Sequence, residues 1–176
     1  MLDFAGTFGS YVNFPTINLG NAISVCAWVY PRTQANFCGL FTNVGPNVAP
    51  SGFKMQWNSY LTQNLNLEMQ AGNGSVGNDN SSVLNIISLN VWQHFGYVFD
   101  QANAQVIFFL NGVPAAMATT TTVSNIGTNK TVNVGAYTGG AYPMNAQLGY
   151  IHVFNTILDA TQINNDFSNS RSRFGV

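Results

Sequence analysis

The chain has 176 residues, of which 46% are apolar and only 6% are charged, whereas charged residues make up about a quarter of a typical soluble domain. The five Lys and Arg against six Asp and Glu leave a net charge of −1, which argues against a nucleic-acid partner, and the apolar content argues against disorder. No apolar run approaches the roughly 20 residues of a membrane span, so we expect no membrane insertion. The length of the chain predicts one domain over residues 1–176.

Neutral polar residues replace the missing charges, and the chain contains 24 Asn. A net charge near zero favours association between proteins. No signal peptide is visible, because Met1 is followed at once by the strand-like residues "LDF". This composition is typical of a virion surface, an extracellular surface or a subunit of an assembly.

Short apolar runs alternate with clusters of Gly, Asn, Pro and Ser, a pattern that predicts an all-β sandwich. Asn111-Gly112 between two apolar runs predicts a tight hairpin, because both residues tolerate positive φ. The Asn- and Gly-rich segment 71–82 predicts a loop. In chain order, we predict strands over residues 9–14, 22–30, 37–42, 52–58, 65–71, 83–88, 94–100, 104–110, 113–118, 130–136 and 147–154.

One helix is predicted near the C-terminus, in "LDATQINNDF". Asp159 is a suitable N-cap residue, and Gln162 stands three positions later as in a capping box. Ile163 and Phe167 then share one face of the helix.

The strands 22–30 and 104–110 are apolar on both faces, whereas a strand with one solvated face alternates. Their outer face is therefore covered, either by loops and the C-terminal helix or by another subunit. Cys26 and Cys38 are too few for a disulfide framework, and pairing about the turn between them leaves them out of register. We expect two free, buried thiols.

Four segments resemble the laminin-G-like, concanavalin A-like jelly-roll domains. They are "LDFAG" followed by "YVNFP", then "AISVCAWVYP", then "WQHFGYVFD" with the hairpin "FLNG", and finally "LGYIHVFNTILDATQI". They occur in the order of the family and cover about residues 2–168. The resemblance implies a two-sheet antiparallel jelly-roll sandwich with one short C-terminal helix.

The resemblance also implies binding, because many members hold calcium or sugars through acidic residues and rim loops. Two acidic positions of the family pattern are Ala5 and Gly149 here. Calcium requires six to eight oxygen ligands. We therefore expect no cofactor beyond a weak calcium site, with Asp3 or Asp100 as the remaining carboxylates.

The segment "VWQHFGYVFDQANAQVIFFLNGV" resembles part of an active site or a metal site, because it holds Trp92, His94 and Asp100. His94 and Asp100 are six residues apart on one extended strand, roughly 20 Å, so they cannot form a catalytic pair. We interpret Trp92, His94, Asp100, Asn111 and Gly112 as scaffold. A zinc site from His94, His152 and a cysteine has no ligand spacing to support it.

Glycoside hydrolysis needs two carboxylates on either side of the scissile bond. The single Glu of the chain, Glu68, has no acid two or three residues away. Hydrolysis is therefore a minor alternative.

We expect a non-catalytic surface binding or assembly module, such as a decoration or fibre component of a virion. A carbohydrate-binding lectin module is the alternative. The expected partners are other protein subunits, in a capsid or a homo-oligomer, and polysaccharide. Aromatic and polar side chains near turns and loops are the candidate ligand contacts: Trp57, Tyr60, Asp79, Asn80, Tyr137 and Tyr142.

Overall fold

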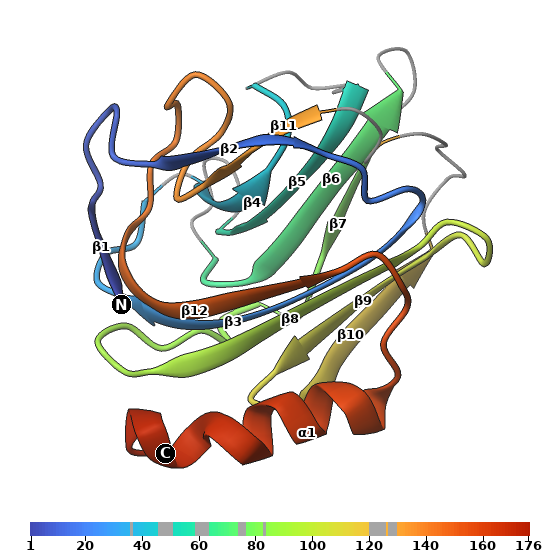
Figure 1. Cartoon of the computed structure of the whole chain (residues 1–176). Helices are drawn as coiled ribbons and strands as arrows, with labels where there is room; N and C mark the ends of the chain where they lie inside the picture. Colours follow the sequence, from blue (N-terminus) through green and yellow to red (C-terminus); the bar gives the residue numbers. More distant parts are fainter. Residues whose placement is uncertain are drawn as a thin grey trace.

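Two six-stranded antiparallel sheets pack face to face in the computed structural model, which describes residues 1–35, 37–45, 51–58, 64–73, 77–82, 84–119, 126 and 130–176. Sheet A has the order β1-β12-β3-β8-β9-β10, and sheet B has the order β2-β11-β4-β5-β6-β7 (Figure 1). The strands are β1 (Leu2–Ala5), β2 (Val12–Ile17), β3 (Ala22–Pro31), β4 (Cys38–Thr42), β5 (Ser51–Trp57), β6 (Leu67–Asn73), β7 (Gly77–Ser81), β8 (Gln93–Asp100), β9 (Gln105–Leu110), β10 (Val113–Thr119), β11 (Lys130–Val134) and β12 (Asn145–Phe154).

The C-terminal helix α1 (Ala160–Ser170) follows the last strand, and the short 3₁₀ helix η1 (Arg171–Phe174) continues it. Asp159 caps α1 with both hydrogen bonds of a capping box, as predicted. The expected all-β jelly roll with one short C-terminal helix is thus confirmed. Among the described residues, no helix has the length and apolarity that crossing a bilayer requires.

The main core fills the space between the two sheets. On β3, the side chains of Ile23, Val25, Ala27 and Val29 belong to this core and are almost completely buried. The alternate residues of β3 must then face the opposite side of sheet A, because successive side chains point to opposite faces of a strand. This alternation explains why β3 is apolar in both phases.

Helix α1 covers the outer face of sheet A (Figure 1). A second apolar cluster joins Cys26, Val98 and Phe109 of the sheet to Leu158 and Ile163 of the C-terminal segment. Of the two alternatives for this face, the chain's own helix therefore provides the cover. A second subunit is not needed to bury these side chains.

The hairpin between β9 and β10 turns at Asn111 and Gly112, with φ angles of 51° and 76°. The prediction from the Asn-Gly pair is confirmed. A β-carbon on Gly112 would also lie 2.9 Å from the Phe167 ring, so the hairpin tip needs glycine for both conformation and close approach of α1.

Three predictions of local structure are wrong. The segment 83–88 forms no strand over its described residues 84–88, because the backbone N–H groups of Asn85, Ile86 and Ile87 bond to the carbonyls of residues 64 and 65. The segment 71–82 is predicted as a loop, but its first residues complete β6 and residues 77–81 form β7. The backbone pairing of β7 with β6 stabilises a strand that the composition does not predict. The strand predicted at 9–14 begins three residues later, after turns at Gly6 and Gly9 with positive φ.

Both cysteines are free and buried, as expected. The reason differs from the proposed register, because Cys26 lies in sheet A and Cys38 in sheet B. Burial raises the pKa of the Cys38 thiol to about 12, so this group is inert at neutral pH.

Candidate functional site

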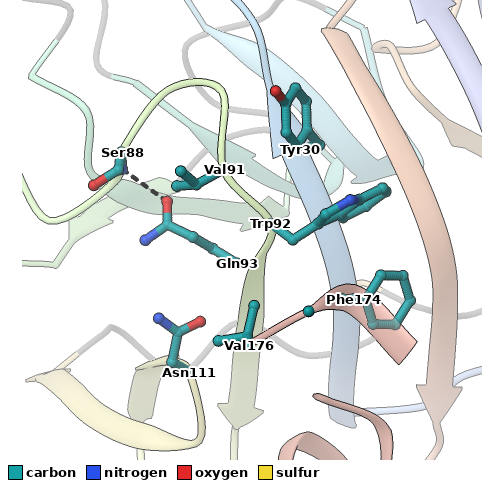
Figure 2. A pocket seen from close by; sticks show the side chains of 9 residues that line it. Tyr30, Ser88, Val91, Trp92, Gln93, Asn111, Phe174 and Val176 are labelled. Atoms are coloured by element: carbon teal, nitrogen blue, oxygen red, sulfur yellow. Dashed lines mark hydrogen bonds between the residues drawn. The ribbon is translucent and has the colours of Figure 1, made fainter. Parts of the chain in front are cut away.

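A pocket of about 510 Å³ opens at the end of sheet A where β3 ends and β8 begins. This volume falls within the usual range for small-molecule sites. None of the described residues that line it has a charged side chain. Its lining consists of Tyr30, Ser88, Val91, Trp92, Gln93, Asn111, Phe174, Gly175 and Val176 (Figure 2).

Three aromatic rings from distant parts of the chain form one side of the pocket. Val29 pairs with Gln93 in the β3–β8 ladder, so Tyr30 and Trp92 are neighbours, with ring centroids 5.5 Å apart. The Phe174 ring comes from η1 and lies 4.9 Å from Trp92. All three residues are partly exposed, so this side of the pocket is not closed off from solvent.

Gly149 on β12 makes room for Phe174. A β-carbon at this position would lie 2.3 Å from the Phe174 ring and 3.2 Å from Trp28 Cβ. Phe174 stacks on the Trp28 ring at 4.5 Å and 19°. The acid that the family resemblance leads one to expect at Gly149 is therefore incompatible with this packing, which builds the pocket wall.

Two amide side chains supply the polar part of the pocket. Gln93 Oε1 accepts a hydrogen bond from Ser88 N at 2.7 Å, and Asn111 Oδ1 accepts one from His94 N at 2.9 Å. Because each amide oxygen faces a backbone N–H, the NH₂ group is the end that remains for other contacts. Figure 2 shows the Gln93 nitrogen on the side of the amide away from Ser88.

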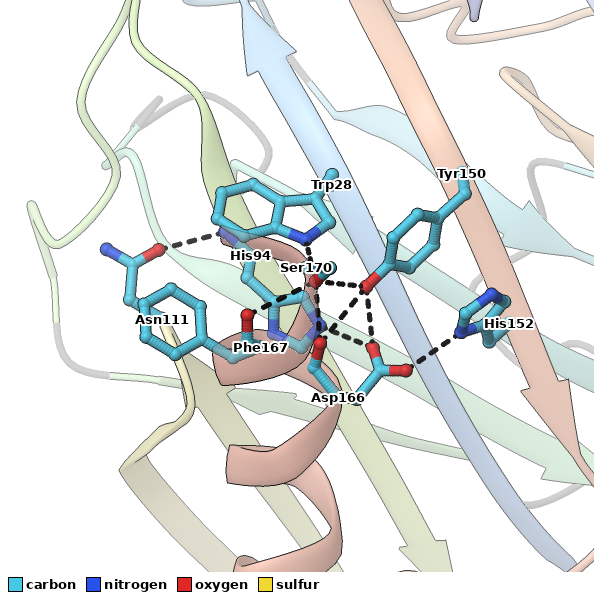
Figure 3. Close-up of polar contacts among 8 residues, drawn as sticks. All are labelled: Trp28, His94, Asn111, Tyr150, His152, Asp166, Phe167 and Ser170. Carbon is cyan, nitrogen blue, oxygen red and sulfur yellow. Dashed lines mark hydrogen bonds and ion pairs between the residues drawn. The ribbon is translucent and has the colours of Figure 1, made fainter. Parts of the chain in front are cut away.

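A network of polar side chains around Asp166 anchors α1 to the outer face of sheet A (Figure 3). The Asp166 carboxylate lies 2.8 Å from His94 Nε2, 2.8 Å from His152 Nδ1 and 2.9 Å from the Tyr150 hydroxyl, which donates to it. His94 is fully buried, and its Nδ1 has no hydrogen-bond partner, so the proton belongs on Nε2, where Asp166 accepts it.

Trp28 extends this anchor to the end of the helix. Its Nε1 donates to the Ser170 hydroxyl at 2.8 Å, and its ring stacks on Phe167 at 5.6 Å. The anchor and the pocket are thus adjacent, because the same C-terminal segment that Asp166 holds in place carries Phe174.

The electrostatics of this cluster do not prepare a nucleophile. Partial burial acts to raise the pKa of Asp166, but hydrogen bonds from His94, His152 and Tyr150 outweigh it and lower the pKa to about 2. Burial, and then the negative charge of Asp166, raise the pKa of the nearby Cys26 thiol far above its usual range. Cys26 is therefore a neutral, buried thiol rather than an activated one.

His94, interpreted from the sequence as scaffold, contacts an aspartate that lies far away in the sequence. His94 bonds to Asp166 and not to Asp100, whose carboxylate accepts instead from Asn103 N at 3.1 Å and Asn103 Nδ2 at 2.7 Å in the turn after β8. Asn111 and Gly112 form the hairpin. Trp92, which the sequence also assigned to the scaffold, additionally lines the pocket.

Two of the described candidate ligand contacts predicted from the sequence do not reach the surface. Trp57 and Tyr137 are fully buried, which corrects their assignment, because a side chain without exposed area cannot meet a ligand from solvent. Tyr142 is partly buried and packs on the Tyr137 ring at 5.0 Å. Asp79 and Asn80 lie on β7, opposite Gln70 and Met69, and Tyr60 lies outside the described residues.

Glu68 is buried, and Gln56 Nε2 donates a hydrogen bond to it. In the ladder between β6 and β7 its partner is Ser81. An exposed catalytic carboxylate is not found at this position.

The two carboxylates considered for calcium are far apart. Asp3 pairs through Gln147 with Tyr30, at one end of β3, whereas Asp100 pairs with Ala22 at the other end, about 26 Å away along the strand. Asp3 also forms an ion pair with Arg32 at 2.6 Å, and this hydrogen-bonded contact lowers the pKa of its carboxyl. One ion cannot use both groups.

The sequence interpretation missed Asp166, Tyr30 and Phe174. A signal for Asp166 exists, because it follows the buried Ile163 by three residues and thus lies on the same helix face. No local pattern marks Phe174, whose role depends on where the chain returns to the sheet.

Several solved structures share this architecture at low identity. A heptameric SAP-like pentraxin from Limulus polyphemus has a TM-score of 0.68 and 18% identity, with 94% of this chain and 80% of that chain covered. Domain 4 of the extracellular arabinanase AbnA from Geobacillus stearothermophilus, in complex with arabinotriose, has a TM-score of 0.70 and 18% identity, with 93% and 74% covered. The botulinum neurotoxin type G receptor binding domain has a TM-score of 0.67 and 12% identity, with 96% of this chain but only 42% of that chain covered.

No curated protein sequence matches the chain at a significant level. A family match, by contrast, covers residues 5–164, which is most of the chain. That range includes both sheets from the end of β1 through β12 and the first half of α1. The chain therefore belongs to the concanavalin A-like lectin/glucanases superfamily, in its laminin-G-like branch.

Proposed function

We propose that the chain is a non-catalytic binding module that takes a neutral saccharide in the pocket beside Trp92. We further propose that it is displayed on a virion or on another extracellular assembly. The observation that carries the binding proposal is the pocket itself, with three partly exposed aromatic rings, two oriented amides and no charged side chain among its described lining residues.

The chemistry of the pocket matches the two faces of a sugar. The C–H face of a pyranose or furanose ring packs on an aromatic ring, as Trp92, Tyr30 and Phe174 allow. The NH₂ groups of Gln93 and Asn111 can donate to hydroxyl oxygens at the ring edge. No cationic side chain stands among the described lining residues, which favours a neutral sugar over an anionic one, because an anion would have to be desolvated without a compensating cation.

Structural relatives support a binding role. The arabinanase domain was solved with arabinotriose, and a botulinum neurotoxin type C structure is described by interaction with two ganglioside molecules. These are properties of those proteins, at 18% and 13% identity. They make sugar binding the first property to test in this chain.

The experiment is titration of the protein with a panel of neutral oligosaccharides, followed by NMR or calorimetry. Trp92→Ala should weaken any binding by roughly 10- to 100-fold, as expected for a central aromatic contact. Phe8→Ala is the matched control, because Phe8 is an aromatic residue that is 80% exposed and does not line the pocket.

Tyr142→Ala separates the pocket from the rim alternative. If Tyr142→Ala abolishes binding and Trp92→Ala does not, the ligand is bound by the 137–146 loop and the pocket assignment is wrong. A reducing-end assay with polysaccharides tests the hydrolase alternative. Turnover that disappears in Glu68→Gln would overturn the non-catalytic assignment.

An assembly role has its own support in the N-terminal edge of the sandwich. The net charge of −1 gives little repulsion between copies. Light scattering tests this role, and a strict monomer at high concentration contradicts self-assembly. Five large apolar side chains within the first 14 residues are exposed: Met1, Leu2, Phe8, Tyr11 and Phe14.

A further inference from the structure

Three side chains of different chemistry converge beneath α1. Cys26 comes from β3, His94 from β8 and Asp166 from α1, and one potential ligand atom of each lies within 4.8 Å of the other two. The β3–β8 ladder pairs His94 with Trp28, so Cys26 is its diagonal neighbour on the same face. We propose that Cys26, His94 and Asp166 form a binding site for a divalent transition-metal ion of the zinc type.

The donor set selects the class of metal. A thiolate, an imidazole and a carboxylate suit Zn²⁺ or Co²⁺, whereas Ca²⁺ and Mg²⁺ require oxygen ligands. With metal–ligand bonds of about 2.0–2.3 Å, tetrahedral geometry places ligand atoms roughly 3.3–3.8 Å apart. A separation at the 4.8 Å limit therefore needs a closure of about 1 Å, whereas His94 Nε2 and Asp166 Oδ2, now 2.8 Å apart, must open by about 0.5 Å. Side-chain rotation can provide both changes.

Charge balance also favours a divalent ion. A divalent cation neutralises the thiolate and the carboxylate together. Binding releases the thiol proton, while the proton on His94 Nε2 moves to Nδ1 as the ion takes Nε2, so affinity should rise with pH.

The surroundings of Asp166 provide support and access. Tyr150 donates to the carboxylate and His152 bonds to its other oxygen, and such outer contacts hold a metal-binding carboxylate in position. His152 is 48% exposed, so an ion can enter from its side. His94 Nδ1 is buried without a partner, which removes the usual second contact of a ligand histidine and weakens the site by about 10- to 100-fold. We therefore expect micromolar affinity.

Co²⁺ titration of the full, reduced and chelator-stripped chain tests the proposal. One equivalent should produce a thiolate-to-cobalt charge-transfer band in the near ultraviolet and the intense visible bands of tetrahedral cobalt, and Zn²⁺ should displace both. A wild-type chain that shows no charge-transfer band overturns the proposal without any variant.

Two cysteine variants provide the matched comparison. Cys26→Ala should lose the band, whereas Cys38→Ala, which removes the other buried thiol from sheet B, should retain it. A band that survives Cys26→Ala places the ion elsewhere and refutes the site. Near-ultraviolet circular dichroism checks that each variant is folded. If Cys26→Ala is not, Asp166→Asn should fold and bind Co²⁺ at least tenfold more weakly, and unchanged affinity refutes the site.

Discussion

Replacement of Asp166 by alanine removes the acceptor that His94, His152 and Tyr150 share. The largest loss concerns His94, because it is fully buried and Asp166 is the only hydrogen-bond partner of its ring in the described structure. A hydrogen bond involving a charged group contributes about 1.5–3 kcal/mol, and the Tyr150 contact adds about 1 kcal/mol. The exposed His152 adds little, and alanine regains about 0.5 kcal/mol of helix propensity.

The expected net effect is a loss of about 3 kcal/mol of unfolding free energy. For a chain of this length, that corresponds to a fall in Tm of roughly 6–12 °C. Urea and thermal unfolding should be measured with a chelator present, so that metal binding does not contribute.

Asp159→Ala is the control in the same helix. It removes the capping box but no contact to the sheet, so about 1 kcal/mol is expected. If Asp166→Ala destabilises the chain no more than Asp159→Ala does, the network around Asp166 is not the anchor of α1 and the reasoning fails.

Three further outcomes follow from the geometry. The pKa of Asp166 is lowered from 3.8 to about 2, so the stability that its ionised carboxylate contributes is fully present above about pH 4 and is lost as the pH falls towards 2. Across that window, the unfolding free energy of the wild type should fall by about 1–2 kcal/mol more than that of Asp166→Asn. Parallel curves of unfolding free energy against pH would contradict this. Gly149→Ala should displace the Phe174 ring from Trp28 and abolish saccharide binding. The near-ultraviolet circular dichroism signal of Trp28 should be lost as well. Unchanged spectra would show that the pocket wall adapts to the new methyl group. Gly112→Ala should cost about 2–3 kcal/mol in chemical unfolding, since its φ is +76° and the new β-carbon meets Phe167, and an effect under about 0.5 kcal/mol would refute the close approach of α1.

Local patterns were sufficient for much of the fold. The runs around 22–30, 94–100 and 104–110 became β3, β8 and β9 with boundaries shifted by at most one residue. Two of them, 22–30 and 104–110, are apolar in both phases, a pattern that suits a covered strand. Asn111-Gly112 and the Asp159 cap were also read correctly, since each depends on a few neighbouring residues. The family resemblance, carried by four short segments in order, was confirmed by the family match over residues 5–164.

Strand β7 shows where local information ends. Its sequence, Gly-Asn-Asp-Asn-Ser, has low strand propensity, yet it pairs with β6 from Gly77 to Ser81. The hydrogen bonds of a neighbouring strand outweigh a difference in propensity of about 1 kcal/mol or less per residue.

The sequence by itself therefore determined the class of fold, the hairpin at Asn111 and the cap at Asp159. The partner of His94 was decided only by the tertiary structure, because Asp166 is 72 residues away along the chain and reaches it by the crossing of α1 over sheet A. The burial of Trp57 and the exposure of Trp92 were decided in the same way. The local sequence around an aromatic residue on or beside a strand does not say which face of the sheet its ring covers. Only the packing of the second layer determines which ring lies in the core and which lines a pocket.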